Sequence, residues 1–359
     1  MLIFRYLAKE VFITLASLTT ILLLIFMSNQ FVVYLNRAAN GQIPGMLVLK
    51  LMMLELPTLM VMLLPLGFYA ALLVAYGRLY ADSEMTVLEA CGYGPRQLLQ
   101  HTFVMASVVM MVVMIIMLWG SPLIMVERAR LLRTTGLQTL IQTIVPGRFR
   151  AISEGRQVFY VASMSRDHTV AKNVFLARLV EKDGHSQWDI LWADNAFAET
   201  EAGSNEDYVI LQKGKQYQGL PGHADYQVAE FSQYKARLPH PTVEVKDDIR
   251  ALKMAELWPL NNPDVRKAAE LQWRFSVSLM VLTLTLVGVP LSRVNPRSGK
   301  YAKLLPAMVV YIVYANALFT ARNWFVTGKT PLWLGMWWPH LVVVFIGLML
   351  IRHNQMKPA

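Results

Sequence analysis

The sequence predicts an α-helical membrane protein with six transmembrane helices and one inserted all-β domain. Three observations support this fold class. The 359 residues are 55% hydrophobic and only 16% charged, whereas soluble chains usually carry about a quarter charged residues. Six long apolar segments are interrupted by almost no charges, and one long polar stretch separates the third from the fourth. An ordinary soluble enzyme is therefore excluded.

The six apolar segments are each long enough for a membrane helix, which needs roughly 20 residues. They are Val11–Leu35, Leu51–Tyr76, Leu98–Val126, Phe275–Leu291, Leu304–Ala321 and Pro331–Ile351. Glu55 is the only Asp, Glu, Lys or Arg in any of them. A carboxylate inside a membrane helix suggests a function by default, and a protonated Glu55 packed against a neighbouring helix is the alternative. The first segment is too long for a signal peptide and lacks a small-residue cleavage site, so we expect it to remain as an anchor.

The charges predict the orientation of the chain. Residues 121–270 hold 19 basic and 19 acidic side chains, so the whole net charge of +10 lies in the membrane part. With a cytoplasmic N-terminus, ten basic residues lie at inner helix ends and four in the short outer loops. The positive-inside rule then places both termini in the cytoplasm and exports the long third loop. Because the one polar domain is neutral, we expect no nucleic-acid partner.

The exported loop is expected to form an antiparallel β-sandwich or jelly roll. Its short runs of Val, Phe, Tyr and Trp are 158–161, 174–180, 188–192, 208–211 and 226–231, separated by turn clusters at 154–155, 182–184, 203–205 and 221–222. Both faces of the strand around Leu176 and Leu179 are apolar. This pattern fits a central strand in a packed core, and it also fits an apolar trough that holds acyl chains.

The sequence contains no catalytic constellation. Cys91 is the only cysteine, and the seven histidines are scattered without metal-ligand spacing. The trio Gly328-Lys329-Thr330 resembles the end of a phosphate-binding loop, but Asn323 stands where that loop needs a glycine. We therefore expect no enzyme activity, no metal and no cofactor in this chain, and any ATP to be bound by a separate subunit.

The first cytoplasmic loop predicts a short docking helix over about residues 82–92. Asp82, Glu84 and Glu89 are three of only five acidic residues in the membrane part. Asp82 or Ser83 is suited to cap the helix, and Gly92 is suited to end it. Met85, Leu88 and Cys91 form an apolar stripe suited to a groove on another protein. A solvated loop helix is the alternative.

Two arginines lie at outer helix ends, against the positive-inside bias. Arg37 follows the first segment, and Arg322 ends the fifth. Arginine at such a position is suited to bind phosphate. Simple extension of the side chain to the membrane surface is the other interpretation.

Four separated motifs carry a resemblance to a known family. They are RYLAKEVF, LYADSEMTVLEACGYGPRQLL, AELQWRF, and VPLSRVNPRSGK followed by LLPAM. In this order and spacing the chain resembles the lipopolysaccharide export permease family, and its F-type more than its G-type subunits. The resemblance implies transmembrane helices 1–3 in residues 1–130, a periplasmic β-jelly roll in 131–255 and transmembrane helices 4–6 in 256–359, within the bacterial inner membrane.

The resemblance also implies partners and roles. The partners are a paralogous permease subunit, a cytoplasmic ABC ATPase dimer, a single-span periplasmic bridge protein of the C type, and lipopolysaccharide extracted from the outer leaflet. Glu84 matches the coupling-helix glutamate of the family, and Arg322 matches a basic position near the outer end of the fifth helix. Gln30 and Val33 replace basic residues of some members, which leaves Arg37 as the nearest cation in the first helix.

An alternative function is a membrane-tethered assembly or sensing protein, whose β domain binds a ligand or partner without translocation. Six spans, with Pro57, Pro65 and Glu55 inside the second, exceed what a tether needs. The sequence therefore favours transport.

Overall fold

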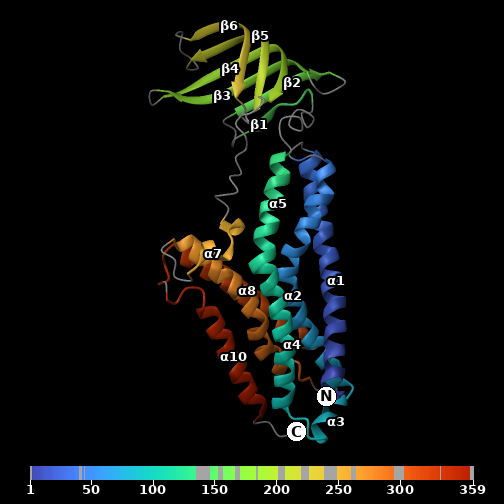
Figure 1. Cartoon of the computed structure of the whole chain (residues 1–359). Helices are drawn as coiled ribbons and strands as arrows, with labels where there is room; N and C mark the ends of the chain where they lie inside the picture. Colours follow the sequence, from blue (N-terminus) through green and yellow to red (C-terminus); the bar gives the residue numbers. More distant parts are fainter. Residues whose placement is uncertain are drawn as a thin grey trace. The chain divides into compact units, whose positions relative to one another are not determined.

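The chain forms two compact units in the computed structural model (Figure 1). The structure describes residues 2–39, 43, 45–134, 146–152, 157–165, 170–182, 185–200, 207–219, 226–237, 249–259, 264–294, 303–331 and 333–355. The helical unit comprises Met1–Phe31, Leu51–Arg128 and Glu244–Ala359. The second unit comprises Val32–Lys50 and Ala129–Val243 and contains all the described strands; we call its sheet the β-domain.

The helices follow the apolar segments of the sequence. They are α1 (Leu2–Ala39), α2 (Val48–Ala81, preceded by the 3-10 turn Gly45–Leu47), α3 (Glu84–Ala90), α4 (Pro95–Ile115), the π-helical turn Ile116–Gly120, α5 (Ser121–Thr134), the 3-10 turn η3 (Ile249–Ala251), α7 (Met254–Leu257), α8 (Val265–Leu291), α9 (Leu304–Val326) and α10 (Trp338–Gln355). The start of α1, the end of α10 and α3 lie at one end of the helical unit (Figure 1). The start of α8 lies at the other end.

Five helices among the described residues are long and apolar enough to cross a membrane: Leu2–Ala39, Gly45–Ala81, Pro95–Leu132, Val265–Leu291 and Leu304–Val326. The sixth predicted segment lies on α10, whose apolar part Trp338–His353 is shorter. This helix begins seven residues after the predicted start because residues 333–337 form turns. The side-chain oxygen of Gln272 accepts a hydrogen bond from the Met336 amide at 3.0 Å and fixes that turn to α8.

Helix α8 forms the centre of the helical unit. In an 18-residue apolar stretch of α8, 72% of the residues are buried, against 17% in the corresponding stretch of α1 and 22% in that of α9. Apolar side chains of α2, α4, α9 and α10 belong to the same core as Val277, Val281 and Leu284 of α8. Groups on α8 are therefore held rigidly by their neighbours.

The β-domain is one six-stranded sheet in which strands neighbour each other in chain order. The strands are β1 (Arg150–Ile152), β2 (Gln157–Met164), β3 (Val170–Lys182), β4 (His185–Thr200), β5 (Asp207–Gly219) and β6 (Gln227–Arg237), all antiparallel. Four predicted runs lie within β2–β5, and the fifth begins one residue before β6, so the prediction of an inserted antiparallel β domain is confirmed. The predicted turn residues 154–155, 183–184, 203–205 and 221–222 lie outside the described residues.

A crease crosses the sheet from β2 to β6. Along this line one residue in each strand is left out of the pairing, and the register is the same on both sides of it. These residues are Ala162, Asn173, Asp194, Lys213 and Ser232. Asn173 and Lys213 have positive φ angles of 49° and 52°, a conformation that reverses the alternation of side chains. Core residues on either side are consequently three positions apart, as Ala171 and Val174 or Phe231 and Tyr234 show.

The crease explains how a single sheet encloses an apolar core. Val161, Val174 and Ala193 are at most 1% exposed, whereas a flat sheet would leave one face open to solvent. Gly214 lies beside the crease, and a Cβ there would come within 2.3 Å of the Trp192 carbonyl oxygen and 2.5 Å of the Phe231 ring. One folded sheet therefore provides the enclosed face for which a sandwich uses two layers.

Candidate functional site

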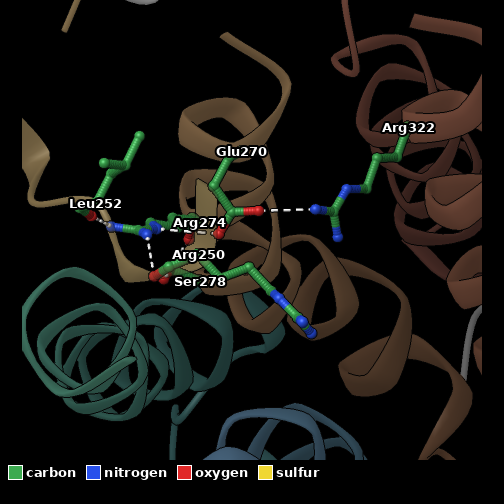
Figure 2. A network of polar contacts seen from close by, with 6 residues as sticks. All are labelled: Arg250, Leu252, Glu270, Arg274, Ser278 and Arg322. Carbon is green, nitrogen blue, oxygen red and sulfur yellow. Dashed lines mark hydrogen bonds and ion pairs between the residues drawn. The ribbon is translucent and has the colours of Figure 1, made fainter. Parts of the chain in front are cut away.

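A buried polar network lies near the start of α8 (Figure 2). Glu270 holds two arginines with its two carboxylate oxygens. The Arg274 Nε donates to Oε1 at 3.2 Å, one helical turn further along α8, and the Arg322 Nη2 of α9 donates to Oε2 at 2.7 Å. The Glu270 side chain is only 5% exposed. The family-like motif AELQWRF thus supplies the carboxylate and one of the arginines.

Arg274 anchors the chain that returns from the β-domain. Its Nη1 donates to the Leu252 carbonyl oxygen at 3.2 Å, and its Nη2 donates to the Arg250 carbonyl oxygen at 2.9 Å. We call residues 249–252 the stem, because they are the first described residues after β6. The Arg274 side chain is 0% exposed, so it makes these contacts entirely inside the protein.

Arg322, the predicted phosphate-binding residue, is the accessible member of this network. Its side chain is 33% exposed, and its guanidinium carbon lies 4.9 Å above the Trp273 ring. In the part of the chain that the structure describes, Glu270 is the only carboxylate paired with either arginine. Two arginines and one carboxylate carry a net positive charge of one, so the arrangement can accept an anion at Arg322.

Arg37, the second predicted phosphate-binding residue, belongs to the other unit. It lies in the last turn of α1 and its guanidinium carbon is 5.8 Å from the ring centroid of Tyr34. The side chain is exposed. Its role in phosphate binding stays a prediction.

Leu176 and Leu179, the predicted acyl-contacting pair, lie on opposite faces of β3. Leu176 pairs with Phe159 and Leu191 and packs against the enclosed core. Leu179 lies three residues further along the same unbroken stretch and is 37% exposed. The two residues therefore do not line one common passage, because alternate residues of a strand face opposite sides. Only Leu176 faces the enclosed side.

A helix, α3 (Glu84–Ala90), is present where the sequence predicts a docking helix, and its docking role stays a prediction. Asp82 and Glu84 are exposed, but Met85 is 1% exposed and belongs to the core of the helical unit, against which Leu88 also packs. Met85 and Leu88 of the predicted apolar stripe therefore face this chain's own core, whereas its third member, Cys91, is exposed. Val87 is an outward apolar residue of α3, with 61% exposure.

The ends of α3 are only partly as predicted. Ser83 occupies the N-cap position with φ 63°, but neither it nor Asp82 caps the helix with its side chain. Gly92 ends the helix with φ +88°. This conformation suits glycine, because it has no Cβ.

Polar contacts that sequence analysis missed fix the loop of α3. The Tyr6 hydroxyl of α1 donates to Glu84 at 2.6 Å. Glu89 accepts from Tyr80 at 3.2 Å and pairs with Arg293 at 3.5 Å. Tyr6 and Arg293 are distant in the chain and Tyr80 lies nine residues before Glu89, so no helical spacing indicates these contacts.

Glu55, the intramembrane carboxylate, also has a basic partner. Arg128 of α5 lies 3.5 Å from it, and both side chains are mostly buried, at 30% and 15% exposure for Arg128 and Glu55. No group of three or more His, Cys, Asp or Glu side chains among the described residues is placed to hold a metal ion.

Together these features define a class of protein: a multi-pass membrane protein with a β-domain inserted between its third and fourth long helices. The family model of the lipopolysaccharide export system permease LptF/LptG matches residues 5–353. The chain belongs to this family.

Curated relatives agree with the family. The chain is 30% identical over 351 residues to the lipopolysaccharide export system permease protein LptF of Escherichia coli (strain K12), covering 98% of this chain and 94% of the relative. The same identity and coverage hold for proteins of the same name from Escherichia coli O157:H7 and Shigella flexneri.

Proposed function

We propose that this chain is the permease subunit of an ATP-driven lipopolysaccharide exporter. It extracts lipopolysaccharide from the outer leaflet of the inner membrane and passes it to a periplasmic bridge. The observation that carries this proposal is the match of the LptF/LptG family to residues 5–353, which spans both units. The helices provide the membrane path, and the enclosed face of the β-domain provides an apolar surface for acyl chains.

The proposal includes separate partner chains. The chain pairs with a paralogous permease. A cytoplasmic ABC ATPase dimer docks at α3 and hydrolyses ATP within its own subunits. A single-span bridge protein of the C type receives the lipid at the β-domain, which lies in the periplasm. Figure 1 shows the start of α1, α3 and the end of α10 at one end of the helical unit, and the charge bias supports a cytoplasmic position for this end.

Copurification distinguishes this function from the tether or sensor. Detergent extracts are expected to yield the chain with an ATPase whose turnover responds to added lipopolysaccharide. Purification as a lone chain, with or without a periplasmic ligand, would support the tether. A noncognate lipid such as phosphatidylcholine serves as the control for stimulation.

Arg322 is proposed to receive a phosphate of the lipid A part. A charge-assisted hydrogen bond contributes roughly 1.5–3 kcal/mol. The Arg322→Ala variant is expected to lower transport and lipid-stimulated ATPase activity more than Arg322→Lys, because lysine retains the charge. Equal losses in both variants would instead indicate that stacking over Trp273 is the role of this arginine.

A further inference from the structure

We propose that Glu270 is a positioning residue that sets the affinity of Arg322 for a phosphate-bearing lipid and couples this site to the stem. The inference rests on the proposed function, in which Arg322 meets the lipid. It assigns a role to a carboxylate that does not itself touch the ligand. Figure 2 shows the geometry: Glu270 lies between the accessible Arg322 on one side and the buried Arg274 on the other.

One carboxylate divides its charge between two guanidinium groups. A buried ion needs a partner, because leaving it alone inside the protein is strongly unfavourable. Arg274 is 0% exposed and Glu270 5%, so neither is open to a ligand. Arg322, at 33% exposure, is where an anion can complete the neutralisation of this cluster. Apart from its bond to Glu270, Arg322 donates no other hydrogen bond within the described residues.

Anion binding at Arg322 changes how the Glu270 carboxylate is shared between Arg322 and Arg274. Phosphate and carboxylate are both negative, so a phosphate bound to Arg322 weakens the contact between Arg322 and Glu270. The carboxylate then pairs more fully with Arg274. Since the other two donors of Arg274 hold the carbonyl oxygens of Arg250 and Leu252, a tighter Glu270–Arg274 pair draws the guanidinium from these oxygens and loosens the stem.

Opposite effects of two charge-removing variants test this coupling. The full chain, in the complex with which it purifies, is placed in phosphatidylcholine nanodiscs, and its affinity for lipopolysaccharide and for dephosphorylated lipopolysaccharide is measured. Glu270→Gln is expected to tighten binding of the phosphorylated lipid about tenfold, because Arg322 no longer shares its charge. Arg274→Gln is expected to weaken binding of the phosphorylated lipid about tenfold, because Glu270 then forms an ion pair with Arg322 alone and neutralises it.

Conservative and control variants complete the test. Arg274→Lys keeps the charge and is expected to restore affinity to within about threefold of the parent. Glu10→Gln removes a different carboxylate that is also paired with an arginine on a neighbouring helix, Arg78 of α2, and it is expected to leave the affinity unchanged. None of the variants is expected to alter binding of the dephosphorylated lipid.

Hydrogen exchange of the stem amides provides the second measurement. Lipopolysaccharide is expected to accelerate exchange at residues 249–252 in the parent and to have no further effect in Glu270→Gln. Weaker or unchanged binding in Glu270→Gln would overturn the inference, because a purely structural carboxylate gives that result. If Arg274→Gln fails to fold, the sign of the Glu270→Gln effect decides. If the parent does not distinguish the two lipids, the phosphate role of Arg322 itself is wrong.

Discussion

Glu84 is the residue whose surroundings most change the expectation from the sequence. It is exposed at the start of α3, as a docking anchor requires, but it also accepts a hydrogen bond from Tyr6. The carboxylate therefore has two candidate roles, one toward a partner and one within this chain. Variants of the two residues separate these roles.

We predict that Glu84→Lys disrupts association with the ATPase more than Glu84→Ala does. Removing one member of a desolvated ion pair costs about 2–5 kcal/mol, and charge reversal adds repulsion. Tyr6→Phe is the control, because it removes only the hydrogen bond to Glu84. Pull-down of the ATPase and coupled transport are measured. A Tyr6→Phe variant as defective as Glu84→Ala would show that Glu84 serves packing within this chain.

Asp189 is a second residue with an unexpected role, inside the β-domain. Its carboxylate is 3% exposed and accepts hydrogen bonds from Arg178 at 2.7 Å and Gln216 at 2.7 Å. Burial lowers the pKa of Arg178, but its hydrogen bond to Asp189 and the attraction of that charge outweigh burial, so the pKa of Arg178 is raised above its usual value. Arg178 therefore stays charged at physiological pH.

We predict that Asp189→Ala lowers the free energy of unfolding of the β-domain by about 1–3 kcal/mol, because buried donors lose their acceptor. Glu230→Gln is the matched control, since its pair with Lys215 is 4.0 Å long and exposed and such pairs contribute little. Denaturant dependence of hydrogen exchange in β3 and β4 is the measurement. Equal effects of both substitutions would contradict a special role of the buried carboxylate.

Among single residues, Met85 shows what a sequence pattern does not contain. The spacing of Met85 and Leu88 indicates that α3 has an apolar side, and this is correct. The same spacing arises whether that side packs on the chain's own core or on a partner. The occupant of an apolar face depends on tertiary structure, so the outward position of Val87 followed only from the fold.

At the level of elements, strand β3 separates two uses of its apolar side chains. We predict that a photo-crosslinking residue at position Leu176 captures lipopolysaccharide in an active complex, whereas one at Leu179 does not, because only Leu176 faces the enclosed side. Crosslinked lipid is detected by mass shift. Capture at Leu179 alone, or at neither position, would contradict the prediction and show that the enclosed face is a packed core without lipid contact.

The elements that sequence analysis missed are those in which apolar residues show no clear periodic spacing. Strand β1 has three residues, too few to show alternation. The crease is hidden for a different reason: spacing of three between Ala171 and Val174 mimics a helix where the flanking pattern indicates a strand. The long apolar segments and the short apolar runs, in contrast, predict six membrane helices and five strands without reference to tertiary contacts; five of the helices are long enough to span among the described residues, and the five strands are present.

At the scale of the whole molecule, the single cysteine reports the orientation of the chain. Cys91 follows α3 and is exposed. We predict that a membrane-impermeant maleimide labels it in inverted inner-membrane vesicles but not in intact spheroplasts, and that a bound ATPase slows the labelling. Gln233→Cys in a Cys91→Ser background is expected to show the reverse, because Gln233 is exposed on β6. Labelling of both from the same side would refute the topology.

The network around Glu270 marks the limit of sequence analysis for the whole molecule. Glu270 and Arg274 are spaced i,i+4, a local signal of an ion pair on a helix. Arg322 follows 52 positions later, and no periodicity connects it to Glu270. Its position at an outer helix end indicated a cation near lipid headgroups, but only the packing of α8 against α9 supplies the carboxylate.

The hold of Arg274 on the stem depends on carbonyl oxygens alone. Every amino acid carries that oxygen, so the anchor does not recognise which side chains occupy positions 250 and 252. The chain that returns to the membrane helices can therefore change its sequence without losing its attachment.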